Sequence, residues 1–173
     1  MRGIKEEIIE IRDYPIPGVG FKDLTPVWKN QEMFNILIDE MTEIWEDAGI
    51  DTVASIESRG FIVGAPIAYK LNAGFVPLRK PDKLPREVHS QPVKLEYGET
   101  EIQVHKDAFE TSKNVLIIDD LLATGGTAIA AFKLVPKDLV VGFGFMVELS
   151  QLNGRKRLEK ISDVKIESLV VYD

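Results

Sequence analysis

Two adjacent acids, Asp119 and Asp120, follow the apolar run 115–118 and stand just before a turn rich in glycine and threonine. The turn and the start of the next segment hold five small or hydroxyl-bearing residues: Ala123, Thr124, Gly125, Gly126 and Thr127. Backbone N–H groups at a helix N-terminus converge on an anion, and glycine lets the backbone approach it closely. Threonine hydroxyls add further donors. The pattern predicts a phosphate site beside a pair of carboxylates.

The turn differs from two common phosphate-binding motifs. It lacks both the Gly-Lys-Ser/Thr ending of the mononucleotide loop and the Gly-x-Gly-x-x-Gly of the dinucleotide loop. Two neighbouring carboxylates would repel a bare polyphosphate, but they suit sugar hydroxyl groups or a magnesium-bound part of a ligand. Ribose hydroxyls close to a 5′-phosphate fit this arrangement. The alternative is that residues 115–127 form only a strand, an Asp-rich turn and a glycine-started helix.

The segment 115–127 resembles the motif with which type I phosphoribosyltransferases bind phosphoribosyl pyrophosphate (PRPP). The resemblance implies that Asp119 and Asp120 bind the ribose hydroxyls. It also implies that the turn from Ala123 to Thr127 binds the 5′-phosphate. Mg²⁺ is the cofactor that it implies, held mainly through PRPP and with no certain protein ligand.

Three other segments are similar to the members of this family that act on adenine, and the first is the Pro/Gly-rich loop at residues 17–26. In those enzymes the loop forms part of a hood over the base. The resemblance implies that Phe21 stacks on adenine, with Gly20 and Lys22 supplying backbone contacts. It assigns Leu121 to the adenine site as well. Adjacent C=O and N–H groups can match the N6 donor and ring-nitrogen acceptor of adenine. Without the resemblance, a Phe that fills the core would be the preferred interpretation.

The other two segments are residues 55–61 and 77–86. The latter holds four basic residues and one acid, a local charge of +3 in a chain whose net charge is −7. A positive patch can attract an anionic substrate even on an acidic protein. The resemblance assigns pyrophosphate contacts to five residues: Ser58, Arg59, Arg79, Lys80 and Lys83. Taken alone, a capping arginine and a solvated charged loop are equally good interpretations.

The Leu-Glu-Tyr-Gly run at residues 95–98 is similar to the flexible loop that closes over the reacting centre in the same enzymes. The resemblance implies that Glu96 is the catalytic acid/base group. Tyr97 would orient it or help to close the site. Without the family, an exposed hairpin glutamate is the alternative. His89, which precedes this loop, could touch phosphate, but a solvated loop histidine is the favoured interpretation.

The elements that must position these residues follow from the pattern of apolar residues. Strands are predicted at 52–56, 75–78, 115–118, 140–147 and 165–171. Helices are predicted at 33–48, 61–71, 126–135 and near 155–160, with Asn30 as N-cap and Gly49 as stop of the first. A hairpin is predicted at 93–97 and 102–105, a loop at 80–92 and a helix at 4–11. This order indicates an α/β fold, a parallel-sheet core flanked by helices, in which ligands bind beyond the C-terminal strand ends.

Length and composition limit the remaining possibilities. A protein of 173 residues can form one domain with a sizeable core, and the absence of cysteine excludes disulfides, Cys-ligated zinc and a Cys nucleophile. The net charge of −7 argues against a nucleic-acid-coating role. No apolar run approaches the roughly 20 residues of a membrane span. We expect a single cytoplasmic domain over 1–173, with a small hood mainly from about 1–35 and about 150–160.

Together these features predict an enzyme that converts adenine and PRPP to AMP and pyrophosphate. Its partners would be small molecules, without nucleic acid or membrane, and the resemblance implies a homodimer. One alternative is a phosphoribosyltransferase for a 6-oxopurine, although the lysine that commonly recognises the oxo group has no identifiable equivalent here. The other is a PRPP-sensing domain without catalysis, against which Glu96, Tyr97 and the basic patch count.

Overall fold

The computed structural model describes residues 3–14, 16–18, 20–94 and 99–173. The protein divides into two compact units, Met1–Glu40 and Met41–Asp173. The parallel sheet, the glycine-rich turn at residues 123–127 and the basic turn at residues 79–86 all belong to the second unit. The segment 150–160, expected in the hood, also belongs to the second unit, whereas residues 1–35 belong to the first.

The first unit is built around a small antiparallel pair of strands. Its elements are α1 (Ile4–Glu7), β1 (Ile9–Ile11), β2 (Phe21–Asp23), α2 (Thr25–Lys29) and the first part of α3 (Gln31–Trp45). Glu10 lies opposite Lys22 across the pair, and Lys22 Nζ is 2.8 Å from Glu10 Oε2. The helix predicted over 4–11 is therefore wrong beyond Glu7, because pairing with β2 outweighs the helical spacing of three isoleucines.

The second unit contains a five-stranded parallel sheet in the order β4-β3-β7-β8-β9. The strands are β3 (Thr52–Ile56), β4 (Gly74–Leu78), β7 (Val115–Leu122), β8 (Val140–Leu149) and β9 (Lys165–Tyr172). All five were predicted, and the parallel α/β class is confirmed. Short 3-10 turns lie at η1 (Glu46–Ala48), η2 (Lys137–Leu139) and η3 (Ser150–Leu152).

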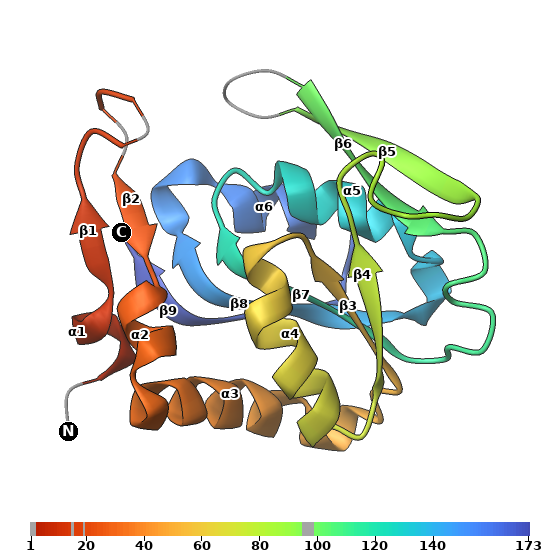
Figure 1. Cartoon of the computed structure of the whole chain (residues 1–173), viewed down its shortest axis with the longest axis horizontal. Helices are drawn as coiled ribbons and strands as arrows, with labels where there is room; N and C mark the ends of the chain where they lie inside the picture. The colour runs from red at the N-terminus through yellow and green to blue at the C-terminus, as the bar shows by residue number, and fades with distance from the viewer. Residues whose placement is uncertain (1–2, 15, 19, 95–98) are drawn as a thin grey trace. The chain divides into compact units, whose positions relative to one another are not determined.

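Helices cover both faces of this sheet (Figure 1). On one face lies α4 (Arg59–Lys70), where Gly64 passes so close to Ser55 of β3 that a Cβ would lie 2.6 Å from the Ser55 Cβ. The end of α3 covers the same face, because a Cβ on Gly144 would meet both Ile118 and Met41. On the other face lies α5 (Gly126–Leu134), and α6 (Gly154–Glu159) precedes β9.

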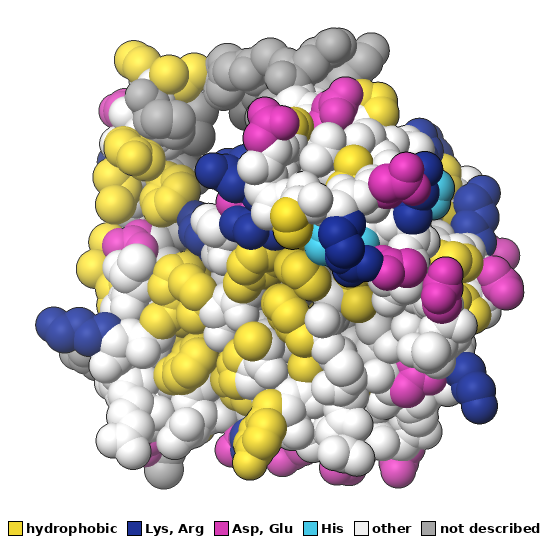
Figure 2. Space-filling model, turned by 45° about the vertical axis from the view of Figure 1, so that its right-hand side comes forward, with side chains coloured by type: hydrophobic (Ala, Val, Ile, Leu, Met, Phe, Trp, Pro, Cys, Tyr) yellow, Lys and Arg dark blue, Asp and Glu magenta, His cyan; other side chains and the backbone are white. Residues whose placement is uncertain are grey.

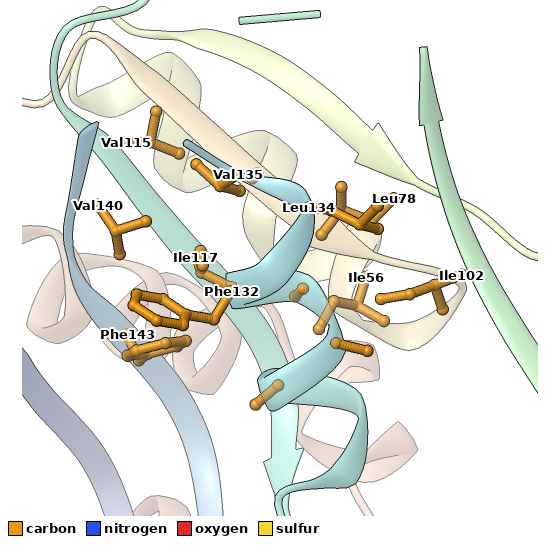
Figure 3. Packing of buried hydrophobic residues seen from close by; sticks show 14 of the residues in the cluster. Ile56, Leu78, Ile102, Val115, Ile117, Phe132, Leu134, Val135, Val140 and Phe143 are labelled. Carbon is orange, nitrogen blue, oxygen red and sulfur yellow. The ribbon is translucent and has the colours of Figure 1, made fainter. Parts of the chain in front are cut away.

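The main hydrophobic core lies between the sheet and α5. Figure 3 shows Phe132 of α5 beside Phe143 of β8 and Ile117 of β7, with the two rings 5.9 Å apart. Phe143 and Ile117 are fully buried. The hairpin continues this core, since Ile102 packs near Ile56 in the same cluster. Each Å² of apolar surface removed from water stabilises the fold by about 25 cal/mol. Burial of this core therefore holds α5 against the strands that position the site.

The hairpin consists of β5 (Val88–Lys94) and β6 (Glu99–His105) and is longer than predicted. Its existence is confirmed, but the loop predicted over 80–92 is wrong from Val88 onward. The prediction failed at Pro92, which lies in β5 opposite Glu101; within the part of the chain that the structure describes, β5 pairs with β6 alone. A strand with an open edge tolerates a residue that lacks an N–H. His89 is thus an exposed strand residue, and residues 95–98 lie outside the described residues.

Local signals at the helix ends agree with the prediction. Asn30 Oδ1 accepts hydrogen bonds from the N–H groups of Glu32 (3.1 Å) and Met33 (3.3 Å), as an N-cap does. Gly49 adopts φ 63° after the turn that follows α3, a conformation that glycine adopts without strain.

The surface carries charges of both signs. Among the described residues of the face in Figure 2, Lys and Arg side chains are interspersed with Asp and Glu. Within the described residues, no helix is both long and apolar enough to cross a membrane.

A glycine in β8 makes the packing of α3 on the sheet testable. An alanine Cβ at Gly142 would lie 2.6 Å from the Trp45 ring and 2.7 Å from the Lys165 carbonyl oxygen, so backbone and ring would have to move apart. We expect Gly142→Ala to lower the free energy of unfolding in urea by ~1–3 kcal/mol. Gly74→Ala is the control, because its Cβ would lie 3.7 Å from Asp51 O, an ordinary contact. Equal stability of both variants would contradict this packing.

Candidate active site

Three of the predicted site segments, residues 55–61, 77–86 and 115–127, meet at the C-terminal ends of the parallel strands. Ile56 of β3 pairs with Leu78 of β4, and Ser55 pairs with Ile118 of β7, so the three strands end on the same side. From β3 the polypeptide proceeds first to β4 on one side and then to β7 on the other. This is a topological switch point, where open α/β sheets bind ligands. Arg59 and Arg79 lie in the segments that follow β3 and β4, and Asp119 lies in the C-terminal half of β7.

The turn after β7 has the geometry of an anion cradle. Gly125 is the N-cap of α5 and adopts φ 78°, a left-handed conformation that glycine tolerates. The turn therefore ends on the N-terminus of α5, where backbone N–H groups and the helix dipole favour negative charge. Thr124 and Thr127 are half-buried, with hydroxyls that can add donors. The local strand–turn–helix arrangement predicted for residues 115–127 is confirmed.

The two carboxylates at the end of β7 have different partners. Asp120 is 4% exposed, and its Oδ2 lies 2.7 Å from Arg59 Nη2 at the start of α4. Asp119 is half-buried, and its Oδ1 accepts a hydrogen bond from the Asp120 N–H at 2.9 Å. A Cβ on Gly60 would lie 2.8 Å from that same Oδ1, so glycine lets α4 begin this close to the carboxylate. The structure thus brings Arg59 and the acidic pair together across the switch point.

Burial dominates the ionisation of this pair. It raises the pKa of Asp119 well above its ordinary value, and the neighbouring Asp120 charge raises it further. Burial also raises the pKa of Asp120, although the Arg59 guanidinium opposes that shift. Both carboxyl groups therefore lose solvation that hydroxyl donors of a ligand could replace.

A glutamate that the sequence interpretation passed over organises the basic turn. Glu57 Oε2 accepts hydrogen bonds from Arg79 Nε at 3.0 Å and from the Lys80 N–H at 3.1 Å. Arg79 Nη1 also donates to the Lys83 carbonyl oxygen at 3.1 Å, which closes the turn. Burial raises the pKa of Glu57, but the Lys80 N–H and the Arg79 guanidinium outweigh it, and the pKa falls below its ordinary value.

This arrangement ties two predicted segments together. Glu57 directly precedes Ser58 through a cis peptide bond, and Ser58 is the N-cap of α4. The anchor of the basic turn and the start of α4 are therefore adjacent in the sequence. Arg79 holds the turn in shape, while Lys80 and Lys83 are exposed on it. The sequence does carry a signal for this anchor: Glu57 stands between an apolar strand and the Ser58-Arg59 pair.

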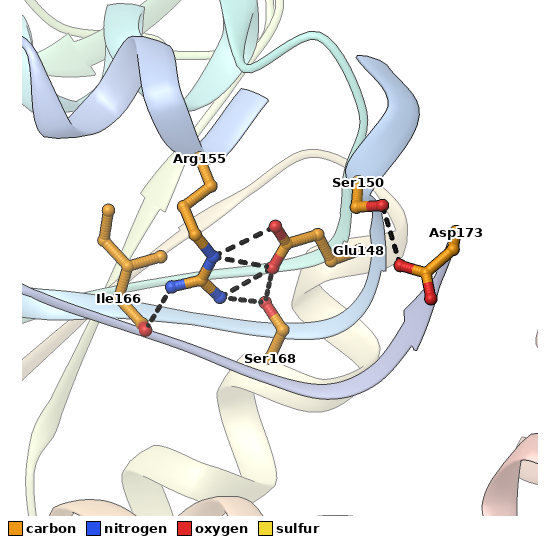
Figure 4. A network of polar contacts seen from close by, with 6 residues as sticks. All are labelled: Glu148, Ser150, Arg155, Ile166, Ser168 and Asp173. Carbon is orange, nitrogen blue, oxygen red and sulfur yellow. Dashed lines mark hydrogen bonds and ion pairs between the residues drawn. The ribbon is translucent and has the colours of Figure 1, made fainter. Parts of the chain in front are cut away.

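A polar network fixes the start of α6 to the sheet (Figure 4). Arg155 donates to Glu148 of β8 at 2.6 Å from Nη2 and 3.0 Å from Nε, and to the Ile166 carbonyl oxygen at 2.8 Å. Ser168 of β9 donates to the same carboxylate at 2.7 Å. The pKa of the Glu148 carboxyl is lowered, because these hydrogen bonds outweigh the effect of burial. The sequence predicted only a charged helix here, since partners on distant strands leave no local pattern.

The remaining predicted site residues are placed separately. In the first unit, the Phe21 ring lies edge-on to Tyr14 at 5.3 Å, Lys22 is buried against Glu10, and Gly20 is exposed. In the second unit, Leu121 is half-buried near the end of β7. The adenine assignments of these residues stay predictions. Glu96 and Tyr97 lie outside the described residues, so their catalytic assignments stay predictions too.

The fold and the site geometry define a class of proteins whose ligand site lies at the switch point of a parallel α/β sheet. Residues 27–166 match the model of the phosphoribosyl transferase domain. The sequence is 50% identical to adenine phosphoribosyltransferase of Thermosynechococcus vestitus over 98% of this protein and 99% of that one.

Solved structures agree with this match. Adenine phosphoribosyltransferase of Thermoanaerobacter pseudethanolicus has a TM-score of 0.88 and 44% identity, over 98% of both proteins. The enzyme of Saccharomyces cerevisiae has a TM-score of 0.86 and 34% identity, over 96% of both proteins. The chain belongs to the phosphoribosyltransferase family and, within it, to the adenine phosphoribosyltransferases.

The raised pKa of Asp119 predicts a stability gain on its neutralisation. A carboxyl whose folded pKa is raised destabilises the fold when it ionises, so this cost is present at high pH and disappears below the ordinary value of 3.8. We expect Asp119→Asn to raise the free energy of unfolding of the ligand-free protein at pH 7.5, because the neutral amide has no charge to desolvate. The asparagine oxygen can still accept the Asp120 N–H.

Urea unfolding at several pH values measures this effect. The difference between Asp119→Asn and the wild type should shrink as the pH falls through the raised pKa. Asp47→Asn, at an exposed acid of η1, is the control for a loss of charge alone. A stability gain shared equally by both variants, or absent from Asp119→Asn, would contradict the assignment.

Proposed function

We propose that this protein transfers the 5-phosphoribosyl group of PRPP to N9 of adenine and releases AMP and pyrophosphate. The observation that carries the proposal is the acidic pair Asp119–Asp120, in which Asp120 lies 2.7 Å from Arg59, followed closely by the glycine-rich turn at the start of α5. Membership of the adenine phosphoribosyltransferases supports adenine as the base. The structure of the yeast relative is a complex that includes adenine.

In this proposal, the ribose 5-phosphate half of PRPP occupies the edge formed by β7 and α5. The backbone amides and hydroxyls of the turn hold the 5′-phosphate; the proposed ligands are Ala123, Thr124, Gly125, Gly126 and Thr127. Ribose hydroxyls donate to Asp119 and Asp120, which restores the solvation that burial removes. Arg59 favours the ionised, hydrogen-bond-accepting form of Asp120 and balances part of the negative charge.

The pyrophosphate half of PRPP faces the starts of α4 and the basic turn. Its proposed ligands are Ser58, Arg59, Arg79, Lys80 and Lys83, with Glu57 shaping the turn that presents the last three. Among the described residues, no group of three or more metal-ligating side chains occurs. In the proposal, Mg²⁺ is held mainly by PRPP, and the half-buried Asp119 is an acid that could face it. The metal ion would neutralise charge on the leaving pyrophosphate.

Adenine is proposed to bind with Phe21 stacking on the ring, and Leu121 is the other proposed side-chain partner of the base. The Lys22 ammonium group is engaged by Glu10 at 2.8 Å, which is compatible with recognition of adenine by the backbone of Lys22 and of Gly20. Backbone carbonyl and N–H groups can match the donor and acceptor edge of adenine.

The chemical step displaces pyrophosphate at ribose C1 through a sugar with oxocarbenium character. Closure of the loop at 95–98 would exclude water from this state. Glu96 would take the proton that N9 loses, or hydrogen-bond another ring nitrogen, while Tyr97 orients it. A homodimer and a cytoplasmic location remain proposals that follow from the family resemblance.

A comparison of bases tests the proposed reaction. Product formation is measured with PRPP and Mg²⁺ and with adenine, hypoxanthine, guanine or xanthine as the base. We expect AMP from adenine, with kcat/KM at least about 100-fold above any 6-oxopurine, because a wrong base leaves polar groups unpaired. Turnover of a 6-oxopurine in preference to adenine would indicate the other transferase. PRPP binding with no turnover of any base would indicate a sensing domain.

The role of Glu96 is tested by Glu96→Gln. We expect kcat to fall about 100-fold or more, the usual contribution of a general acid/base group, with little change in PRPP affinity. Steady-state kinetics and calorimetry measure the two quantities. Glu101→Gln, on the described strand β6 of the same hairpin, is the matched control and should keep its turnover. An unchanged kcat in Glu96→Gln would remove this residue from the mechanism.

A further inference from the structure

The first turn of α6 packs directly against the backbone of the phosphate-binding turn. A Cβ on Gly154 would meet the Ala123 carbonyl oxygen and lie 3.0 Å from Gly125 N. A Cβ on Gly125 would in turn lie 3.0 Å from Gly154 O and 3.1 Å from Gly154 Cα. Two glycines thus allow the two backbones to touch, although they are far apart in the sequence.

One arginine of α6 bonds to the turn itself. Arg157 Nη1 donates to the Thr124 carbonyl oxygen at 2.6 Å. The Thr124–Gly125 peptide is trans, as are all described peptides except Glu57–Ser58. In a planar trans peptide the carbonyl and the next N–H point in opposite directions. With the carbonyl held by the guanidinium, the Gly125 N–H points away from the Arg157 guanidinium.

The orientation of this peptide decides whether the turn attracts or repels an anion. Glycine populates positive and negative φ almost equally, so residue Gly125 alone does not fix the peptide plane. The opposite orientation would present the Thr124 carbonyl oxygen, a partial negative charge, where the N–H now points. A charge-assisted hydrogen bond from a guanidinium is roughly twice as strong as a neutral one, enough to favour one orientation.

The support for Arg157 is itself fixed to the sheet. Two residues earlier, Arg155 is held by Glu148 of β8 and by the Ile166 carbonyl oxygen of β9. The hydrogen bond with Glu148 raises the pKa of Arg155, which therefore remains a cation. A series of hydrogen bonds thus connects strands β8 and β9, through Arg155 and Arg157 of α6, to the turn at residues 123–127.

We propose that Arg157 is a positioning residue for the 5′-phosphate site. It acts through the Thr124 carbonyl oxygen and keeps the Gly125 N–H directed at the phosphate, without touching the phosphate itself. The inference rests on the proposed function, since it assumes that this turn binds the 5′-phosphate of PRPP. It adds a residue from an element that supplies no ligand of its own.

The test compares Arg157→Met, Arg157→Lys and the control Lys156→Met, which removes the same charge from the neighbouring exposed position. Ribose 5-phosphate and PRPP–Mg²⁺ are titrated by calorimetry. We expect Arg157→Met to weaken ribose 5-phosphate binding about tenfold and to raise the KM for PRPP more than it lowers kcat. Arg157→Lys should recover part of the affinity, because an ammonium can still donate to the carbonyl. Lys156→Met should bind as the wild type does.

A second measurement separates positioning from charge and from loss of fold. Hydrogen exchange of the Gly125 amide in the ligand-free protein should accelerate in Arg157→Met only, while the urea midpoint stays close to the wild type. Equal weakening in Arg157→Met and Lys156→Met would mean a purely electrostatic effect and would overturn the proposal. Unchanged affinity and exchange in Arg157→Met would overturn it as well. A wild type that binds no ribose 5-phosphate would instead refute the proposed function, on which the inference depends.

Discussion

The site depends on one ion pair, Asp120 with Arg59, formed across the switch point between β3 and β7 at 2.7 Å. Burying a carboxylate alone would be costly, because the low dielectric of the interior favours its neutral form. The guanidinium offsets that cost and so allows two acids to stand side by side at the end of a buried strand. The same contact fixes where α4 begins, and α4 in turn begins beside Glu57, the anchor of the basic turn.

The site also requires that helices approach it closely, and glycine allows this at two places. Gly60 lets α4 start against Asp119, and Gly154 lets α6 lie against the turn before α5. Each contact leaves no room for a Cβ, so neither could be made by another residue without moving an element. The acidic pair and the anion cradle are therefore held from both sides by helices whose positions come from the sheet. Rigid support of this kind lets a site bind without first having to order itself.

Much of the fold was predictable because its signals are local. The buried strands, the Asn30 cap, the stop at Gly49 and the strand–turn–helix around Asp119 all depend on neighbouring residues. The failures came where partners distant in sequence decide the outcome. The segment after Glu7 became a strand by pairing with β2, and the Pro92 segment became a strand by pairing with β6.

Residue types and their spacing were enough to predict the family and the parallel sheet, because they carry hydrogen-bonding capacity and periodicity. Asp119, Arg59 and the glycine-rich turn could be identified in this way. Only the tertiary structure determines which charged groups form contacts with one another. The fold pairs Arg59 with Asp120, Arg79 with Glu57, and Arg157 with the Thr124 carbonyl. Such pairings join strand ends and helices separated by tens of residues, and packing of the sheet and its helices brings them within hydrogen-bonding distance. The sequence therefore determines which groups each residue can bind, and the tertiary structure determines which of those groups lies within reach.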